Sequence, residues 1–283
     1  MLPLLSYLFY FVAASASPLQ RRWLATKRTA EGIGQVHFAF KVASVTVVLS
    51  LLIPFFSPLQ FTGNAYFLFL LALTAGIFGA GYFVTSYIAQ KHVEAGISTL
   101  VSNVYTPITI ILATTFLNER LTLVQWLGTL LLLFAIMFVS KKHRIGRFKF
   151  DKYFLMMLAS GVFLGVVLTA ERALQKITGF TAGTLLSWWS QCLFLGIATI
   201  ITHSKSAYTT KDTLVTGVLR FFQTLSWVVL LFVIGNLSVV SIVTTFKVVV
   251  IFIAAALFLK EREDMSRKIT GSIIAVVGLL LMK

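Results

Sequence analysis

Acidic side chains, and charged side chains in general, are scarce in this sequence. Only 12% of the 283 residues are charged, and the nine Asp and Glu are outnumbered by 24 Lys and Arg. A soluble domain carries about 25% charged residues, so this chain has too few to cover a water-facing surface. Apolar residues make up 58% of it. The composition excludes an ordinary soluble protein and indicates a membrane protein.

Cysteine is nearly absent, and the histidines are not clustered. Cys192 is the only cysteine, which excludes a disulfide within the chain. The four histidines, His37, His92, His143 and His203, lie at or near the ends of apolar runs, without the spacing of a metal or catalytic site. We therefore predict that the protein is not an enzyme and holds no metal. Because no ATP-binding motif is present either, we expect no cofactor, and any transport would be driven by gradients or exchange.

The sequence consists instead of long apolar runs from end to end. Each run has about the 20 residues that a membrane-spanning helix needs. We predict ten spans, at residues 2–19, 35–57, 66–90, 95–117, 122–140, 153–176, 180–202, 213–234, 237–259 and 267–282. The connections are too short for a soluble domain. The predicted fold class is an all-α integral membrane protein.

One passage occurs twice, at residues 93–140 and 235–282. In each copy an apolar run ends in Phe-Leu-x-Glu-Arg, at 116–120 and 258–262. A short polar turn and a second apolar run follow in both. Two such units in one membrane protein indicate a duplication, which is typical of transporters.

The duplication predicts two five-helix repeats, at 1–141 and 153–283, joined by a basic linker at 142–152. Because five is an odd number, the two repeats must lie in the membrane in opposite senses, as inverted repeats. Their equivalent turns then face opposite sides, and the first carries one basic residue while the second carries four. An inverted repeat predicts such a difference in charge.

The basic residues also predict an orientation. Seventeen of them lie in the odd-numbered connections between the predicted spans, against three in the even-numbered ones. In short loops this excess marks the cytoplasmic side, where it also meets anionic lipid headgroups. Both chain ends would then lie outside. The net charge of +15 is explained in this way, and we expect membrane lipids rather than nucleic acid as the partner.

The chain resembles the drug/metabolite transporter superfamily, and specifically its EamA-type ten-helix permeases. The resemblance lies in the two Phe-Leu-x-Glu-Arg turns, in Gly128 and Gly271 after them, and in the stretch from Ser102 to Pro107. The second copy departs from the pattern, with Val249 at the position of that proline. The resemblance implies a pseudo-twofold bundle, a central cavity and alternating access. It also implies that both termini are cytoplasmic, opposite to the charge count.

Three cationic residues lie well inside predicted spans, away from the span ends, where a charge is costly and indicates function. Lys247 lies ten residues into its span and occupies the repeat position of Tyr105. Arg220 and Lys41 each lie about one-third of the way along theirs, so either could instead reach the cytoplasmic headgroups. We predict all three as candidate substrate-binding residues.

Acidic residues are missing from the middle of the predicted spans. Glu171 is the exception, and it stands beside Arg172 near the end of its span. A proton-coupled exporter of cations would need a carboxylate deep in the bundle. Cations without matching acids favour a ligand with a carboxylate or a phosphate group.

Neutral hydrogen-bonding and aromatic side chains accompany these cations in the spans, as a small metabolite with a polar head requires. The alternative for each of them is simple packing between helices. The remaining candidate substrate-binding residues are Tyr82, Asn103, Tyr105, Trp188, Gln191, Gln223, Trp227 and Thr244.

Together these features predict a secondary transporter that exports or exchanges a small amino-acid-like or other anion-bearing metabolite around a midplane cavity. We expect it in the prokaryotic cytoplasmic membrane, and a fused inverted pair is compatible with function as a monomer. One alternative is a flippase for a lipid-linked phosphate or sugar, which would show a lateral opening between helices. The other is an intramembrane enzyme acting on a lipid phosphate.

Overall fold

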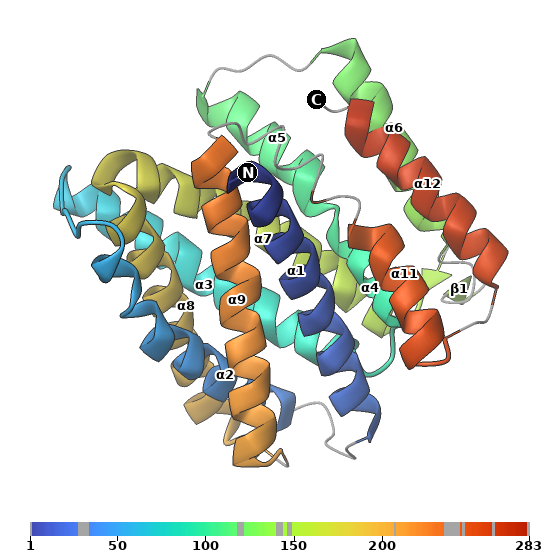
Figure 1. The fold of residues 1–283 in the computed structure, drawn as a ribbon, viewed down its shortest axis with the longest axis horizontal. Coiled ribbons are helices and arrows are strands. Elements are labelled where there is room, and N and C mark those ends of the chain that lie inside the picture. The colour runs from blue at the N-terminus through green and yellow to red at the C-terminus, as the bar shows by residue number, and fades with distance from the viewer. Residues whose placement is uncertain are drawn as a thin grey trace.

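Helices make up nearly all of the described chain in the computed structural model (Figure 1). The described residues are 2–27, 34–117, 122–139, 144–145, 149–206, 208–234, 244, 247–261 and 264–281. The helices are α1 (Leu2–Lys27), α2 (Gly34–Ser50), the 3-10 helix η1 (Ile53–Phe55), α3 (Ala65–Ala89), α4 (Ala95–Ser102), α5 (Tyr105–Leu117), α6 (Leu123–Val139), α7 (Lys152–Thr178), α8 (Phe180–Thr202), α9 (Thr210–Ile234), α11 (Lys247–Phe258) and α12 (Met265–Leu281). Two short strands, β1 (Arg144–Ile145) and β2 (Lys149–Phe150), pair antiparallel within the predicted linker. The helical class is therefore confirmed.

Five of the ten predicted spans are supported by the length and apolar character of the described helices. They are Gly34–Phe55, Ala65–Ala89, Lys152–Thr178, Phe180–Thr202 and Thr210–Leu230. Helices of this length cross the hydrocarbon core of a bilayer. The exact set of ten spans stays a prediction.

Two of the remaining predicted spans differ from the structure in ways that matter for the site. The predicted span 95–117 consists of two helices, because the chain breaks between α4 and α5 at Asn103 and Val104, shortly before Pro107. The predicted span 237–259 lies partly outside the described residues, and α11 covers only Lys247–Phe258 of it.

Proline and tightened hydrogen bonding account for the break. Pro107 stands in the first turn of α5, where its missing N–H costs no helical hydrogen bond. Before it, the N–H of Asn103 donates to Leu100 O at 3.1 Å and that of Val104 to Val101 O at 3.1 Å. These bonds to the third residue back tighten the last turn of α4 and end it.

Two glycines of α7 let this break lie directly against that helix. A Cβ atom at Gly161 would stand 3.0 Å from the backbone oxygen of Ser102, and one at Gly165 would stand 3.0 Å from that of Tyr105. Small residues at such spacing allow close backbone approach in membrane proteins. The start of α5 is therefore fixed against α7.

The packing contacts that α3 makes with two helices resemble those that α9 makes with two others. α3 packs on α7 and α8, while α9 packs on α1 and α2, and α6 lies alongside α12 (Figure 1). If the first and second halves are equivalent, α3 corresponds to α9, α1 to α7 and α2 to α8. The pairings then match, which supports the duplication, although the inverted repeat itself stays a prediction.

The outward-facing sides of several helices are apolar. On α6, Trp126, Leu130 and Phe134 are each more than half exposed. On α8, Leu193 and Ile200 are also exposed. Such extensive apolar exposure is unusual for a monomeric soluble protein and suits contact with lipid tails.

Candidate functional site: a charged cavity between the helices

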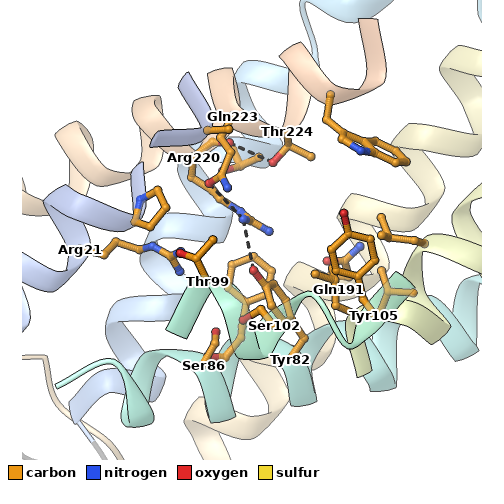
Figure 2. A pocket seen from close by; sticks show the side chains of 18 of the residues that line it. Arg21, Tyr82, Ser86, Thr99, Ser102, Tyr105, Gln191, Arg220, Gln223 and Thr224 are labelled. Carbon is orange, nitrogen blue, oxygen red and sulfur yellow. Dashed lines mark hydrogen bonds between the residues drawn. The ribbon is translucent and has the colours of Figure 1, made fainter. Parts of the chain in front are cut away.

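A cavity of about 150 Å³ lies between helices of both halves of the chain. Its wall draws on α1, α2, α3, α4, α5, α7, α8, α9 and α11. Four charged side chains line it, namely Arg21, Glu171, Arg220 and Lys247. Figure 2 shows Arg21 and Arg220 reaching into it from neighbouring helices, above the α3 and α4 side chains. A cavity enclosed by helices, with a few convergent polar groups, is the usual form of a small-molecule site.

Arg220 of α9 is held by aromatic and amide groups. Its guanidinium carbon lies 5.0 Å from the ring centroid of Phe83 and 5.5 Å from that of Tyr82. Its Nη1 donates to the Tyr82 hydroxyl at 3.5 Å and to Gln223 Oε1 at 3.3 Å (Figure 2). These contacts are cation–π and hydrogen-bonding interactions with neutral groups, so they orient the charge without neutralising it.

Lys247 is the first residue of α11. Its Nζ lies 5.8 Å from the ring centroid of Tyr105, the residue at the equivalent position of the first copy. The ammonium and the hydroxyl of Thr244 both interact with the hydroxyl of Tyr10, which is 2% exposed. Lys247 is thus surrounded by neutral hydroxyl and aromatic groups.

Arg21 is a wall residue that the sequence analysis placed in a loop. The first span was predicted to end at residue 19, but α1 continues to Lys27, and Arg21 is only 8% exposed. Its guanidinium carbon lies 4.9 Å from the ring centroid of Tyr87. Its Nε and Nη1 are buried and complete no hydrogen bond with the described residues.

Helical spacing in the sequence could have revealed Arg21. The wall residues of α1 are Tyr10, Ala14, Pro18 and Arg21. They recur at intervals of three and four, which places them on one face of a helix. The apolar run alone hid this pattern, because it stops before the arginine.

Glu171 lies in the cavity wall, which its sequence position near the end of a predicted span did not indicate. It is 4% exposed and belongs to the cavity wall, since α7 continues to Thr178 and turns this side chain inward. Its Oε2 accepts a hydrogen bond from Ser187 Oγ at 2.8 Å, and that Oγ accepts one from Gln191 Nε2 at 2.9 Å. The cavity wall therefore contains a buried carboxylate, and its cations are not without an acid.

Most of the side chains predicted to bind substrate lie together in the wall. Those that line the cavity are Tyr82, Asn103, Tyr105, Trp188, Gln191, Arg220, Gln223, Trp227 and Lys247. Thr244 is fully buried beside Tyr10 and is not a wall residue. Lys41 is exposed on α2 and does not line the cavity, as the headgroup alternative predicts for it. Whether the wall residues bind substrate stays a prediction.

Two ion pairs tie α1 and α12 to neighbouring parts of the chain. Arg22 of α1 pairs with Glu261, with Nε and Oε1 2.8 Å apart, and Oε2 accepts the backbone N–H of Ala95 at 3.0 Å. Lys268 of α12 pairs with Glu94. The charged turn of the second copy is thus tied to α1 and to the start of α4. The corresponding Glu119 and Arg120 of the first copy lie outside the described residues.

Comparisons with known proteins agree with this architecture. Residues 4–141 match the model of the EamA-like transporter family. No curated protein matches the sequence significantly. Twenty-seven chains of solved structures do match. One of them, a crystal structure of a protein 14% identical, aligns over 98% of this chain and 97% of its own with a TM-score of 0.57, which shows a shared fold across both halves.

Proposed function

Because this chain belongs to the EamA-like transporter family of the drug/metabolite transporter superfamily, we propose that it is a secondary transporter of a small, anion-bearing metabolite such as an amino-acid-like compound. Members of this family are membrane transporters rather than enzymes. The protein would act by alternating access around the cavity, as an exporter or exchanger in a prokaryotic cytoplasmic membrane.

The charge of the cavity wall is the observation that carries this proposal. Arg21, Arg220 and Lys247 bring three positive charges to it, against one carboxylate at Glu171. Fixed cations inside a membrane protein are costly and serve a purpose, and carboxylate or phosphate groups are their natural ligands. A net positive wall therefore favours an anionic group on the substrate.

Unsatisfied donors in the wall support the same conclusion. Arg21 Nε and Nη1 and Asn103 Nδ2 are buried and complete no hydrogen bond with the described residues. A buried donor left unpaired costs about 1–3 kcal/mol, so such groups indicate a missing acceptor. The oxygens of a bound carboxylate or phosphate would satisfy them.

Apolar and aromatic wall residues would hold the rest of the molecule. Ala43, Leu164, Val167 and Trp227 line the cavity together with the charged groups. A wall of this kind binds an apolar portion by burial, while a few polar groups orient the head. An amino acid with an apolar side chain combines these features.

Counterflow in proteoliposomes tests the proposal. We expect the full chain to exchange at least one of L-leucine, L-glutamate, L-malate and glucose 6-phosphate, each supplied as a labelled compound. Lys247→Ala should weaken that exchange at least tenfold, and Lys41→Ala, which removes an exposed lysine outside the cavity, should not. Exchange that survives Lys247→Ala undiminished for every anionic compound would refute the cationic site.

A further inference from the structure

Glu171 is the one acidic side chain among the described residues of the cavity wall. A ligand that carries only anionic groups gives it no role, because a carboxylate repels such a ligand. It is nevertheless nearly inaccessible, at 4% exposure, and its Oε2 is held by Ser187 at 2.8 Å. An ionisable group kept at membrane depth in a transporter indicates part of the transport pathway.

The surroundings of Glu171 contain cations but no second acid. Arg220 of α9 interacts with it electrostatically, and Arg172 is its neighbour in sequence. The titratable or charged wall residues on other elements are Tyr82 of α3, Tyr105 of α5, Arg21 and Tyr10 of α1 and Lys247 of α11, while α8 contributes the neutral Ser187, Trp188 and Gln191. A proton on Glu171 is therefore not shared with another carboxylate of the described wall.

We propose that Glu171 is a proton-binding site that couples the movement of protons to the transport of the anionic substrate. This inference rests on the proposed function of the cavity. When ionised, Glu171 offsets part of the positive charge of the wall, so it competes electrostatically with the anionic substrate. When it takes up a proton from the cavity, the carboxylate becomes a neutral carboxyl group, and that competition ends.

The direction of coupling follows from this competition. Proton and anion each favour the binding of the other, and by linkage the effect is equal in both directions. The two would therefore cross the membrane together, as in symport. For a substrate whose own charge is constant, the affinity should rise as the pH falls, by up to about tenfold per pH unit for one linked proton.

Proton binding can be measured without any substrate. Infrared difference spectra of the full chain in lipid, recorded as the pH is varied, should contain the band of a protonated carboxyl group. Glu171→Gln should remove one such band, while Asp264→Asn, which alters an exposed carboxylate paired with Arg267, should leave that band in place. A Glu171→Gln spectrum identical to that of the wild type would overturn the proposal.

A second variant protects this test if Glu171→Gln fails to fold. Ser187→Ala keeps the carboxylate but removes the hydrogen bond to its Oε2. It should shift the midpoint of the carboxyl band and leave its amplitude unchanged. An unshifted midpoint would show that the titrating group is not Glu171.

Transport measurements then test the coupling itself. L-leucine, L-glutamate, L-malate and glucose 6-phosphate are supplied with and without an imposed pH gradient. For each compound that the wild type exchanges, Glu171→Gln should retain exchange at equal pH but lose gradient-driven accumulation. Accumulation equal to that of the wild type would refute the coupling. If the wild type exchanges none of the four, the proposed function fails, while the infrared result still decides whether Glu171 binds a proton.

Discussion

The first residues of α5 and α11 stand at matching sequence positions and differ in chemistry. α5 begins at Tyr105, and α11 begins at Lys247, 142 residues later. The helices that follow them, α6 (Leu123–Val139) and α12 (Met265–Leu281), are separated by the same 142 residues. The two copies therefore place a neutral phenol and an ammonium group at matching points. These side chains face one another, with Lys247 Nζ 5.8 Å from the Tyr105 ring centroid.

This difference contributes to a cavity wall whose charges are shared unequally between the two copies. Lys247 faces the neutral Tyr105, and the further charged wall residues are Arg21, Arg220 and Glu171. In the first copy the preceding residues Ser102 and Asn103 line the cavity, while in the second Thr244, the counterpart of Ser102, contacts Tyr10. Matching sequence positions therefore carry different chemistry.

The largest effect is expected from making the two helix starts alike. Lys247→Tyr would place a phenol in both copies and remove the ammonium group from the wall. Loss of a buried charge that pairs with a ligand costs about 2–5 kcal/mol, so the affinity for the transported anion should fall by about 30-fold or more. Competition binding to the protein in nanodiscs measures it.

A matched change in the other copy is the control for Lys247→Tyr. Tyr105→Phe keeps the aromatic ring that faces the ammonium and removes only the hydroxyl. We expect a change in affinity of a few-fold at most, because the cation–π contact is preserved. Equal losses in the two variants would contradict the asymmetry between the copies.

A smaller effect is expected at the charged turn that follows α11. Glu261→Gln weakens the pair with Arg22, whose Nε is 2.8 Å from Oε1, while keeping an acceptor for the N–H of Ala95. Both charged side chains are 12% exposed, so their interaction is only partly screened by solvent. A double-mutant cycle with Arg22→Gln should give a coupling energy of about 1–2 kcal/mol for unfolding in detergent.

The effect of the Arg22–Glu261 pair can be distinguished from that of the nearby Arg267–Asp264 pair. Arg267→Gln removes a partner of Asp264 on the same turn and serves as the control, since that pair is local and half exposed. It should lower the unfolding temperature less than Glu261→Gln does. A coupling energy near zero for Arg22 and Glu261 would show that the ion pair does not tie α1 to the end of α11.

A third effect, of comparable size, is expected where the start of α5 rests on α7. A Cβ atom at Gly165 would lie 2.8 Å from Ile108 and 3.0 Å from the backbone oxygen of Tyr105. Gly165→Ala should therefore destabilise the protein by about 1–3 kcal/mol, because overpacking displaces the backbone. Gly196→Ala, which meets only the movable ring of Phe40 at 3.1 Å, should cost less. Thermal unfolding of both variants checks the difference, and equal unfolding temperatures would contradict the close contact.

Much of the fold is predictable because long apolar runs are a strong signal. The predicted spans 66–90 and 180–202 coincide with α3 and α8 to within one residue at each end. The exact position of the break at Asn103 cannot be read from the hydropathy, because the residues there are neutral. Pro107 is the sequence feature that indicates an interruption of this run.

A charge that stands alone in an apolar run was the clearest sequence signal for the site, although Lys41, which also stands alone, is exposed outside the cavity. Lys247 and Arg220 were found for this reason, and both line the cavity. Arg21 was missed because it adjoins Arg22, and two arginines after an apolar run resemble the start of a loop. The place of Glu171 in the cavity wall was not foreseen, because sequence position does not tell which way a side chain turns. Both errors concern helix length and direction, which depend on tertiary packing.

The smallest expected effect tests how the asymmetry of the two copies is maintained. The Tyr10 hydroxyl lies between Thr244 and the ammonium of Lys247, so it holds the cation in place without neutralising it. Tyr10→Phe keeps the buried ring and removes the hydroxyl, whose hydrogen bond to the charged ammonium is worth about 1.5–3 kcal/mol. The affinity for the transported anion should fall by only about 2–10-fold, because the ammonium itself remains in the wall. A loss as large as that of Lys247→Tyr would instead mean that Tyr10 contacts the substrate itself, because positioning one cation cannot be worth more than the cation.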